Sequence, residues 1–218
     1  MDNKIVEISN QMIERYSRRY LEMGYDVKTL GWGSVEQQQF RFCQTFSGFE
    51  FKKETTLLDI GCGFGDFLSY ILGKNLNLGY YTGWDINPDL INEAKKIWGN
   101  KSEICSFDVK NLSEIEVSSP VADIVIMLGL LNLNLEGKFD NYEYSKRLIK
   151  KAFSCSKDLL VVDFLSGNRT PEYPKEDFVF YHDPVKMLEF AFSLTDNVVL
   201  KHDYAPIPQK EFMLFIYK

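Results

Sequence analysis

A glycine-rich turn between an apolar strand and a helix is the sequence feature that most constrains the fold of this chain. Residues 57–67 read Leu-Leu-Asp-Ile-Gly-Cys-Gly-Phe-Gly-Asp-Phe, and an apolar helical stretch continues to Leu72. Glycines at alternate positions permit a tight turn and let a ligand approach the main chain where no Cβ is in the way. The following helix would present its first N–H groups toward the same crevice. The segment therefore predicts the strand–turn–helix unit that begins a nucleotide-binding α/β fold.

The spacing of these glycines separates two classes of ligand. Dinucleotide-binding folds usually have the pattern G-x-G-x-x-G, and their turn faces a pyrophosphate. Here Gly61, Gly63 and Gly65 follow the pattern G-x-G-x-G, and Asp59 stands two residues before the first glycine. A carboxylate at that position would repel a pyrophosphate and would suit an ammonium group. The segment resembles motif I of the class I S-adenosylmethionine-dependent methyltransferases.

The resemblance continues beyond the turn, in the order of that family. The segment Tyr80–Asn87 reads as a second strand ending in an acid, Asp85, twenty residues after Gly65. In both nucleotide families such an acid accepts hydrogen bonds from ribose hydroxyls. Asp108 lies in the third-strand segment, and the resemblance implies that it bonds the adenine amino group, although an acid there is also a common turn residue. The remaining predicted strands are 121–128, 159–165 and a terminal hairpin of 198–204 with 212–217.

The resemblance implies a cofactor, S-adenosylmethionine, and the residues that would hold it. Phe107 is predicted either to stack on adenine or to pack in the core. Arg19 or Arg41 would pair with the methionine carboxylate, while Tyr16 and Tyr20 would line the site or simply pack their helix onto the sheet. The predicted cofactor-binding residues are Asp59, Gly61, Cys62, Gly63, Asp85, Ile86, Asp108, Val109, Leu128 and Arg19.

Alternating strands and helices predict a doubly wound α/β fold with a parallel sheet covered on both faces. The expected architecture is a seven-stranded, mostly parallel Rossmann-like sheet with a C-terminal antiparallel hairpin and an N-terminal helical lid. One methyltransferase domain is expected over residues 1–218, with a helical cap in 1–50 and the core in 55–218. Ser34 is a predicted N-cap and Pro88 a predicted first-turn proline. The predicted helices are 8–23, 35–45, 66–72, 88–98, 141–154 and 184–192.

Cysteine usage and net charge indicate the cellular compartment and the class of partner. The four cysteines are scattered without a C-x-x-C pair, which argues against a zinc site or a disulfide framework and favours the cytoplasm. The N-terminus does not resemble a signal peptide. Nucleic-acid binders usually carry a basic patch, whereas this chain has a formal net charge of −6. We therefore expect a small-molecule acceptor, no nucleic acid and no membrane partner.

The segment after the fourth strand argues against two acceptor classes. Methyltransferases that modify base amines or glutamine generally carry an Asn- or Asp-Pro-Pro-aromatic segment there, and this chain has Met-Leu-Gly-Leu-Leu-Asn at 127–132. Metal-dependent catechol enzymes need carboxylate ligands after the fourth and fifth strands. Here the first acid after the fourth strand is Glu136, so no metal site is predicted.

His182 and Asp183 are the predicted catalytic residues. A histidine beside an acid, on the loop after the fifth strand, could act as a general base near neutral pH. The alternative is that Asp183 caps the helix that begins at Pro184 and that His182 packs or lies at the surface.

The sequence thus predicts a methyltransferase acting on a small molecule, such as a sugar or natural-product hydroxyl or amine. The sulfonium donor is already activated, so alignment of the acceptor supplies most of the catalysis. A non-catalytic cofactor-binding or scaffold protein is the alternative, and an RNA methyltransferase is less favoured. A NAD-dependent oxidoreductase is disfavoured by the glycine spacing and by Asp59.

Overall fold

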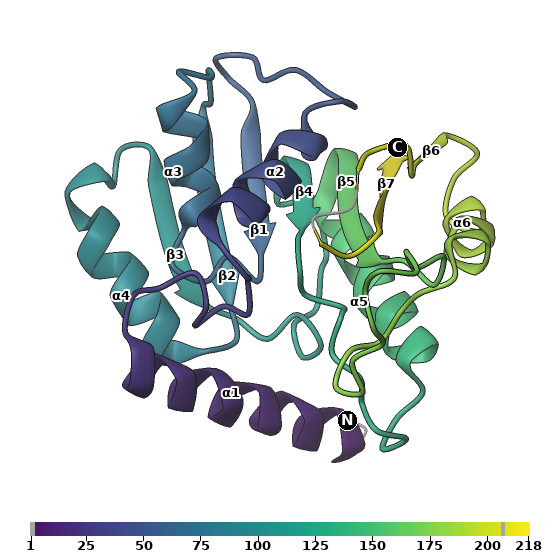
Figure 1. Ribbon diagram of the computed structural model, residues 1–218. Helices are drawn as coiled ribbons and strands as arrows, with labels where there is room; N and C mark the ends of the chain where they lie inside the picture. The colour runs from purple at the N-terminus through teal and green to yellow at the C-terminus, as the bar shows by residue number, and fades with distance from the viewer. Residues whose placement is uncertain (1–2, 206–207) are drawn as a thin grey trace. The chain divides into compact units, whose positions relative to one another are not determined.

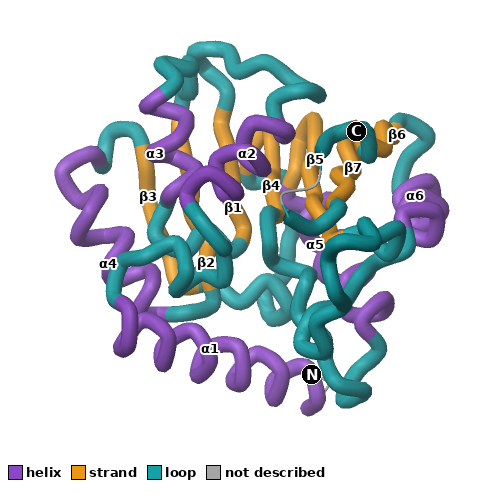
Figure 2. Tube along the Cα trace, viewed as in Figure 1, coloured by secondary structure: helices purple, strands orange, loops and turns teal. Residues whose placement is uncertain are grey.

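The computed structural model describes residues 3–205 and 208–218. Contacts divide the chain into two compact units, Met1–Glu116 and Val117–Lys218. Figures 1 and 2 show strands alternating with helices along the chain. No helix within the described residues is both long and apolar enough to cross a membrane.

The first unit contains three parallel strands in the order β3-β2-β1. The register aligns Ile60 with Trp84 and Asp85 with Val109, so the carboxyl ends of the strands lie at one edge. Its elements are α1 (Asn3–Met23), α2 (Val35–Thr45), β1 (Thr56–Ile60), α3 (Asp66–Gly73), β2 (Tyr80–Asp85), α4 (Pro88–Trp98), a short 3₁₀ helix (Gly99–Lys101) and β3 (Cys105–Val109).

The second unit contains strands in the order β4-β5-β7-β6. Strands β4 and β5 are parallel, and β7 runs antiparallel to both β5 and β6. Its elements are β4 (Ala122–Met127), α5 (Asn141–Cys155), β5 (Ser156–Leu165), α6 (Pro184–Phe192), β6 (Val198–Lys201) and β7 (Glu211–Tyr217).

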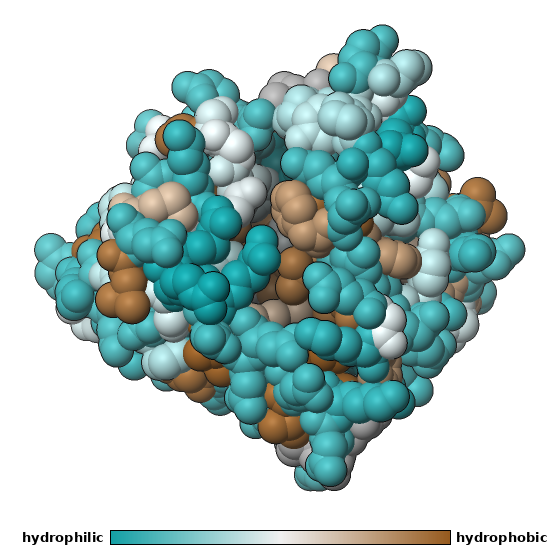
Figure 3. All heavy atoms as spheres, turned by 60° about the horizontal axis from the view of Figure 1, so that its bottom comes forward, coloured by the Kyte–Doolittle hydropathy of each residue, from teal (hydrophilic) through white to brown (hydrophobic). Residues whose placement is uncertain are grey.

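The predicted fold class is confirmed: a mixed sheet of parallel strands, flanking helices and a terminal antiparallel hairpin. Strands β1, β4 and β5 are buried along most of their length, as expected for parallel strands covered on both faces. The face drawn in Figure 3 is largely hydrophilic, with scattered hydrophobic residues. The buried apolar side chains form the cores of the units.

Helix boundaries follow the caps that the sequence contains. Ser34 accepts a hydrogen bond from the Gln37 N–H at 3.3 Å, as predicted for the start of α2. Asn87 caps α4, with Pro88 in its first turn, and Asp183 caps α6. Helix α1 begins at Asn3, five residues before its predicted start, and two strand limits lie three residues from the expected ones. β5 begins at Ser156 because α5 leads into it without a loop, and β6 ends at Lys201 opposite Met213, so His202 lies just beyond it.

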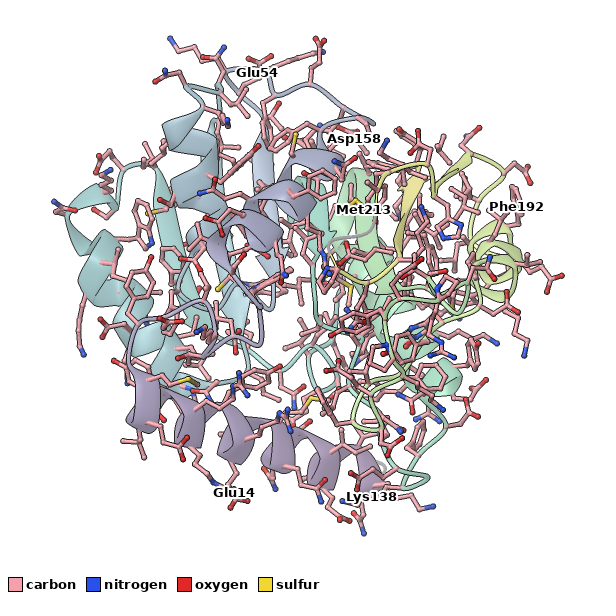
Figure 4. The ribbon with its side chains drawn as sticks, viewed as in Figure 1. Glu14, Glu54, Lys138, Asp158, Phe192 and Met213 are labelled. Carbon is pink, nitrogen blue, oxygen red and sulfur yellow. The ribbon has the colours of Figure 1, made fainter. Side chains whose placement is uncertain are left out.

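Helix α1 crosses below the carboxyl ends of β2 and β3 in Figure 1. The Asn87 side-chain amide, after β2, donates to Ile13 O (2.9 Å) and to Ser17 Oγ (3.1 Å). The Asn111 amide, after β3, donates to Ser9 Oγ at 3.1 Å. The outer side of α1 carries Glu14 (Figure 4). Polar side chains at two strand ends thus hold the N-terminal helix over the edge where the glycine turn lies.

Asn87→Ala should lower the free energy of unfolding by about 2–4 kcal/mol. The change removes a helix cap, worth about 1 kcal/mol, and leaves two part-buried acceptors of α1 without their donor, at about 1–3 kcal/mol. Urea denaturation measures the loss. Ser34→Ala removes a cap and no tether to α1, and it should cost about 1 kcal/mol. Equal losses for the two variants would contradict a tethering role for Asn87.

Candidate functional site

The glycine turn of the first unit satisfies most of its own N–H groups. The N–H groups of Gly61 and Cys62 donate to Trp84 O at 2.7 and 3.1 Å, and the Gly65 N–H donates to Cys62 O at 2.9 Å. The Gly63 N–H donates to Asp85 Oδ2 at 3.0 Å. These four donors are used within the protein, so they form no free cradle for a pyrophosphate. The structure thus supports the sequence argument against a dinucleotide.

Two of the three motif glycines have identifiable packing reasons. All three have positive φ, at 80°, 54° and 81° for Gly61, Gly63 and Gly65. A Cβ on Gly65 would lie 2.7–2.8 Å from the Trp98 and Phe107 rings, so this glycine serves the core. Phe107 is itself 4 % exposed, which assigns it to the core. A Cβ on Gly63 would lie 2.8 Å from Leu30, a residue of the loop after α1.

Asp85 occupies the place predicted for a ribose-binding acid. Its carboxylate is buried at the end of β2, where Oδ2 accepts from Gly63 N and Oδ1 accepts from Asn87 N at 2.8 Å. Burial raises the pKa of Asp85, and the backbone donors partly oppose that rise. Ile86 follows directly and is half-buried. A carboxylate with two oxygens fixed by backbone donors is oriented before any ligand arrives.

Asp59 lies under the turn and is 4 % exposed. Its Oδ2 accepts a hydrogen bond from the Tyr81 hydroxyl at 2.6 Å. Burial raises the pKa of Asp59 to about 7, and the neighbouring Asp85 and Asp66 carboxylates add to the rise while Tyr81 opposes it. A cationic ligand nearby would draw Asp59 toward its ionised form.

The remaining predicted cofactor residues have different surroundings. Asp108 and Val109, at the end of β3, are exposed, and Val109 is 50 % exposed. The Cys62 thiol is buried, which raises its pKa, so it stays protonated.

Arg19 donates to Thr29 O at 2.9 Å and to Lys28 O, so it holds the loop after α1. Leu128 is buried directly after β4, in the second unit. Their roles toward a cofactor stay predictions.

Three residues that the sequence did not single out also build this region. Tyr81 provides the hydrogen bond to Asp59, and Asn87 provides both a cap and a tether for α1. Asp66, in the first turn of α3, accepts from the Tyr25 hydroxyl and the Gln38 amide, each at 2.9 Å. The sequence signals were an acid directly after the last glycine and the Asn-Pro pair at a helix start.

On the second unit, His182 is completely buried. Its Nε2 lies 2.9 Å from Ser145 Oγ, and its ring packs against Tyr142, Phe164 and Phe180. Burial lowers the pKa of His182 to about 3. The Asp183 carboxylate accepts from Val185 N (2.8 Å) and Lys186 N (3.4 Å), so it caps α6. These contacts favour the alternative in which Asp183 caps α6 and His182 packs in the core. The predicted catalytic role of the two residues remains untested.

A metal centre is not evident in the described part of the chain. No group of three or more His, Cys, Asp or Glu side chains there is placed to hold a metal ion. The acidic side chains that come together at the glycine turn are the aspartates 59, 66 and 85.

Comparisons with known proteins identify the family. A family model described as a methyltransferase domain matches residues 51–189, well over half of the chain. The chain belongs to the class I S-adenosylmethionine-dependent methyltransferases. The matched segment contains the glycine turn, Asp85 and Asp108. The predicted family, enzyme class and cofactor are confirmed.

Solved methyltransferase structures share this fold at low sequence identity. Magnesium protoporphyrin IX methyltransferase from Synechocystis PCC 6803, with bound S-adenosylhomocysteine, has a TM-score of 0.65 and 16 % identity, and the match covers 100 % of both chains. The small RNA methyltransferase HEN1 has a TM-score of 0.64 and 18 % identity over 83 % of this chain and 25 % of that one.

A curated relative is an uncharacterized protein of Methanocaldococcus jannaschii, 28 % identical over 142 residues. The match covers 65 % of this chain and 55 % of that relative, so this chain spans about half of the relative's length.

The stability of the second unit should depend on pH through His182. The folded-state pKa of about 3 lies below the usual 6.5, so the folded state binds fewer protons than the unfolded state between these values. Stability is therefore full above pH 6.5 and falls as pH drops, by up to about 1.4 kcal/mol per pH unit. Denaturation of the wild type and of His182→Gln at pH 7.0 and 5.5 measures the difference. Parallel pH profiles for the two proteins would contradict the neutral, buried histidine.

Proposed function

We propose that this protein transfers a methyl group from S-adenosylmethionine to a small-molecule acceptor, such as a sugar or natural-product hydroxyl or amine. The observation that supports the cofactor part is the pre-oriented Asp85 carboxylate, which lies beside a turn whose N–H groups at residues 61, 62, 63 and 65 are used within the protein. Such a site suits ribose hydroxyls and a cation rather than a pyrophosphate. The aspartates 59, 66 and 85 supply the negative charge that a sulfonium and an ammonium group prefer.

The small-molecule acceptor rests on charge and on the segment after β4. A net charge of −6 disfavours a phosphate backbone, and residues 127–132 lack the Asn- or Asp-Pro-Pro-aromatic segment. The Gly129 N–H in that segment donates to Asp163 at 2.6 Å, which fixes the backbone directly after the strand. Neighbouring folds include an RNA methyltransferase, so RNA remains the acceptor to test against.

Catalysis in this proposal depends on alignment more than on a base. S-adenosylmethionine supplies an activated methyl group when bound. Asp85 would orient its ribose, and Asp59 its ammonium group, so that an acceptor meets the methyl carbon at near-attack distance. His182, with a pKa of about 3, would be a weak proton acceptor at neutral pH. If the His182→Ala protein keeps its fold but its turnover falls about 10²-fold, the result would support His182 as the general base.

Incubation with methyl-labelled S-adenosylmethionine and separate metabolite, RNA and protein fractions tests the acceptor class. Label should enter the metabolite fraction. Label confined to RNA would contradict the small-molecule acceptor. Saturable binding of the cofactor without any label transfer would favour the non-catalytic alternative.

Asp85→Ala should weaken S-adenosylhomocysteine binding by about 2–4 kcal/mol, because charge-assisted hydrogen bonds are worth about 1.5–3 kcal/mol each and need not add fully. Calorimetric titration measures the change. Asp89→Ala, which removes an acid from the first turn of α4, is the matched control and should bind as the wild type does. An Asp85→Ala protein that is folded and binds normally would exclude Asp85 from the site.

Cofactor binding should release a proton from Asp59. The free protein holds this proton up to a pKa of about 7, and an adjacent ammonium group would favour the carboxylate. Affinity should therefore rise by up to about tenfold per pH unit below pH 7 and level off above it. Calorimetry in buffers of different ionisation enthalpy detects the released proton, and Asp59→Asn should abolish the signal. Buffer-independent heats in the wild type would contradict this linkage.

A further inference from the structure

The loop between α1 and α2, residues 24–34, packs directly on the glycine turn. Leu30 fills the space beside Gly63 that the missing Cβ leaves, with its Cδ1 2.8 Å from the position of such a Cβ. The Tyr25 ring meets the Phe64 ring edge-on, with centroids 4.9 Å apart. The close approach that a motif glycine offers to a ligand is therefore taken at Gly63 by a side chain of this protein.

The loop is ordered by its own hydrogen bonds and is held by α1. Thr29 is fully buried, and its hydroxyl donates to Gly24 O at 2.8 Å. The Trp32 N–H donates to Val27 O at 3.1 Å. Arg19 of α1 donates to the carbonyls of Lys28 and Thr29. The loop is therefore a compact unit, attached to α1 through a part-buried guanidinium.

The attachment of the loop to α3 is different in kind. The Tyr25 hydroxyl, near the start of the loop, donates to the Asp66 carboxylate at 2.9 Å. The Gln38 amide of α2, four residues after the loop, donates to the same carboxylate at 2.9 Å, and these two bonds form the Asp66 clasp. Tyr25 is 56 % exposed, so water can compete for this bond. Gly24, with a φ of +64° and no atom within 4 Å of its Cβ position, lies at the start of the loop. The attachment of the loop to α3, beside the glycine turn, is therefore easier to break than its attachment to α1.

We infer that the loop of residues 24–34 is a gate, with Leu30 closing the glycine turn at Gly63 and the Asp66 clasp holding it shut. This inference rests on the proposed function, which puts the cofactor against that turn. A ligand that contacts the Gly63 main chain has to displace Leu30, and displacement of Leu30 draws Tyr25 away from Asp66. The clasp therefore stabilises a state that excludes the cofactor, and the fraction of open gate scales the apparent affinity and the rate of entry.

Stopped-flow fluorescence with S-adenosylhomocysteine as the ligand tests the gate. Tyr25→Phe removes one clasp bond and should raise the association rate constant about three- to tenfold. Tyr80→Phe is the matched control, because Tyr80 begins β2, at the other end of that strand from Asp85, and its rate should equal that of the wild type.

Leu30→Ala removes the blocking side chain itself and should raise the association rate at least as much. Adding Tyr25→Phe to Leu30→Ala should give no further increase, because the clasp then has nothing to hold in place. Unchanged or slower association in both single variants, with thermal unfolding as in the wild type, would overturn the gate. Absence of binding in the wild type would instead overturn the proposed function, so the two failures are distinct.

Discussion

The buried carboxylate of Asp85 is the interaction on which the first unit depends. One oxygen accepts from the glycine turn and the other from Asn87, whose side chain caps α4 and tethers α1. A single acid therefore connects β2, the turn after β1 and two helices. Burying a charge is costly unless hydrogen bonds compensate it, and here two backbone donors do so. The same bonds leave the carboxylate in a fixed orientation at the carboxyl edge of the strands.

Negative charge is the second constraint on this region. Asp59 and Asp85 are both buried near the turn, and burial raises the pKa of each. A hydrogen bond from the Tyr81 hydroxyl to the Asp59 carboxylate limits this cost. A ligand that carries a sulfonium and an ammonium group would relieve the repulsion, whereas a pyrophosphate would increase it. The electrostatics of the turn thus agree with the family to which the chain belongs.

Sequence reasoning succeeded where one local pattern has one physical solution. The glycine turn, the acid at the end of β2 and the caps Ser34 and Asp183 followed from backbone rules alone. It was less informative where a side chain has several possible partners. Arg19 was expected to meet a carboxylate, and in the structure it holds two backbone carbonyls. His182 next to Asp183 suggested an acid–base pair, yet a helix cap and an aromatic enclosure separate their roles.

The glycines illustrate the same limit. Their pattern predicts a turn, but it cannot tell whether the space beside each one is kept for a ligand or for the protein. Gly65 makes room for Trp98 and Phe107, and Gly63 makes room for Leu30. Only the tertiary contacts distinguish these cases, because Leu30 and Trp98 are more than thirty residues from the glycines they meet.

A crystal structure of the protein with S-adenosylhomocysteine tests the central claim most directly. The account predicts that both ribose hydroxyls bond the Asp85 carboxylate and that the amino group lies toward Asp59. Ribose bound away from Asp85, or a ligand with its charged end remote from Asp59, would contradict it.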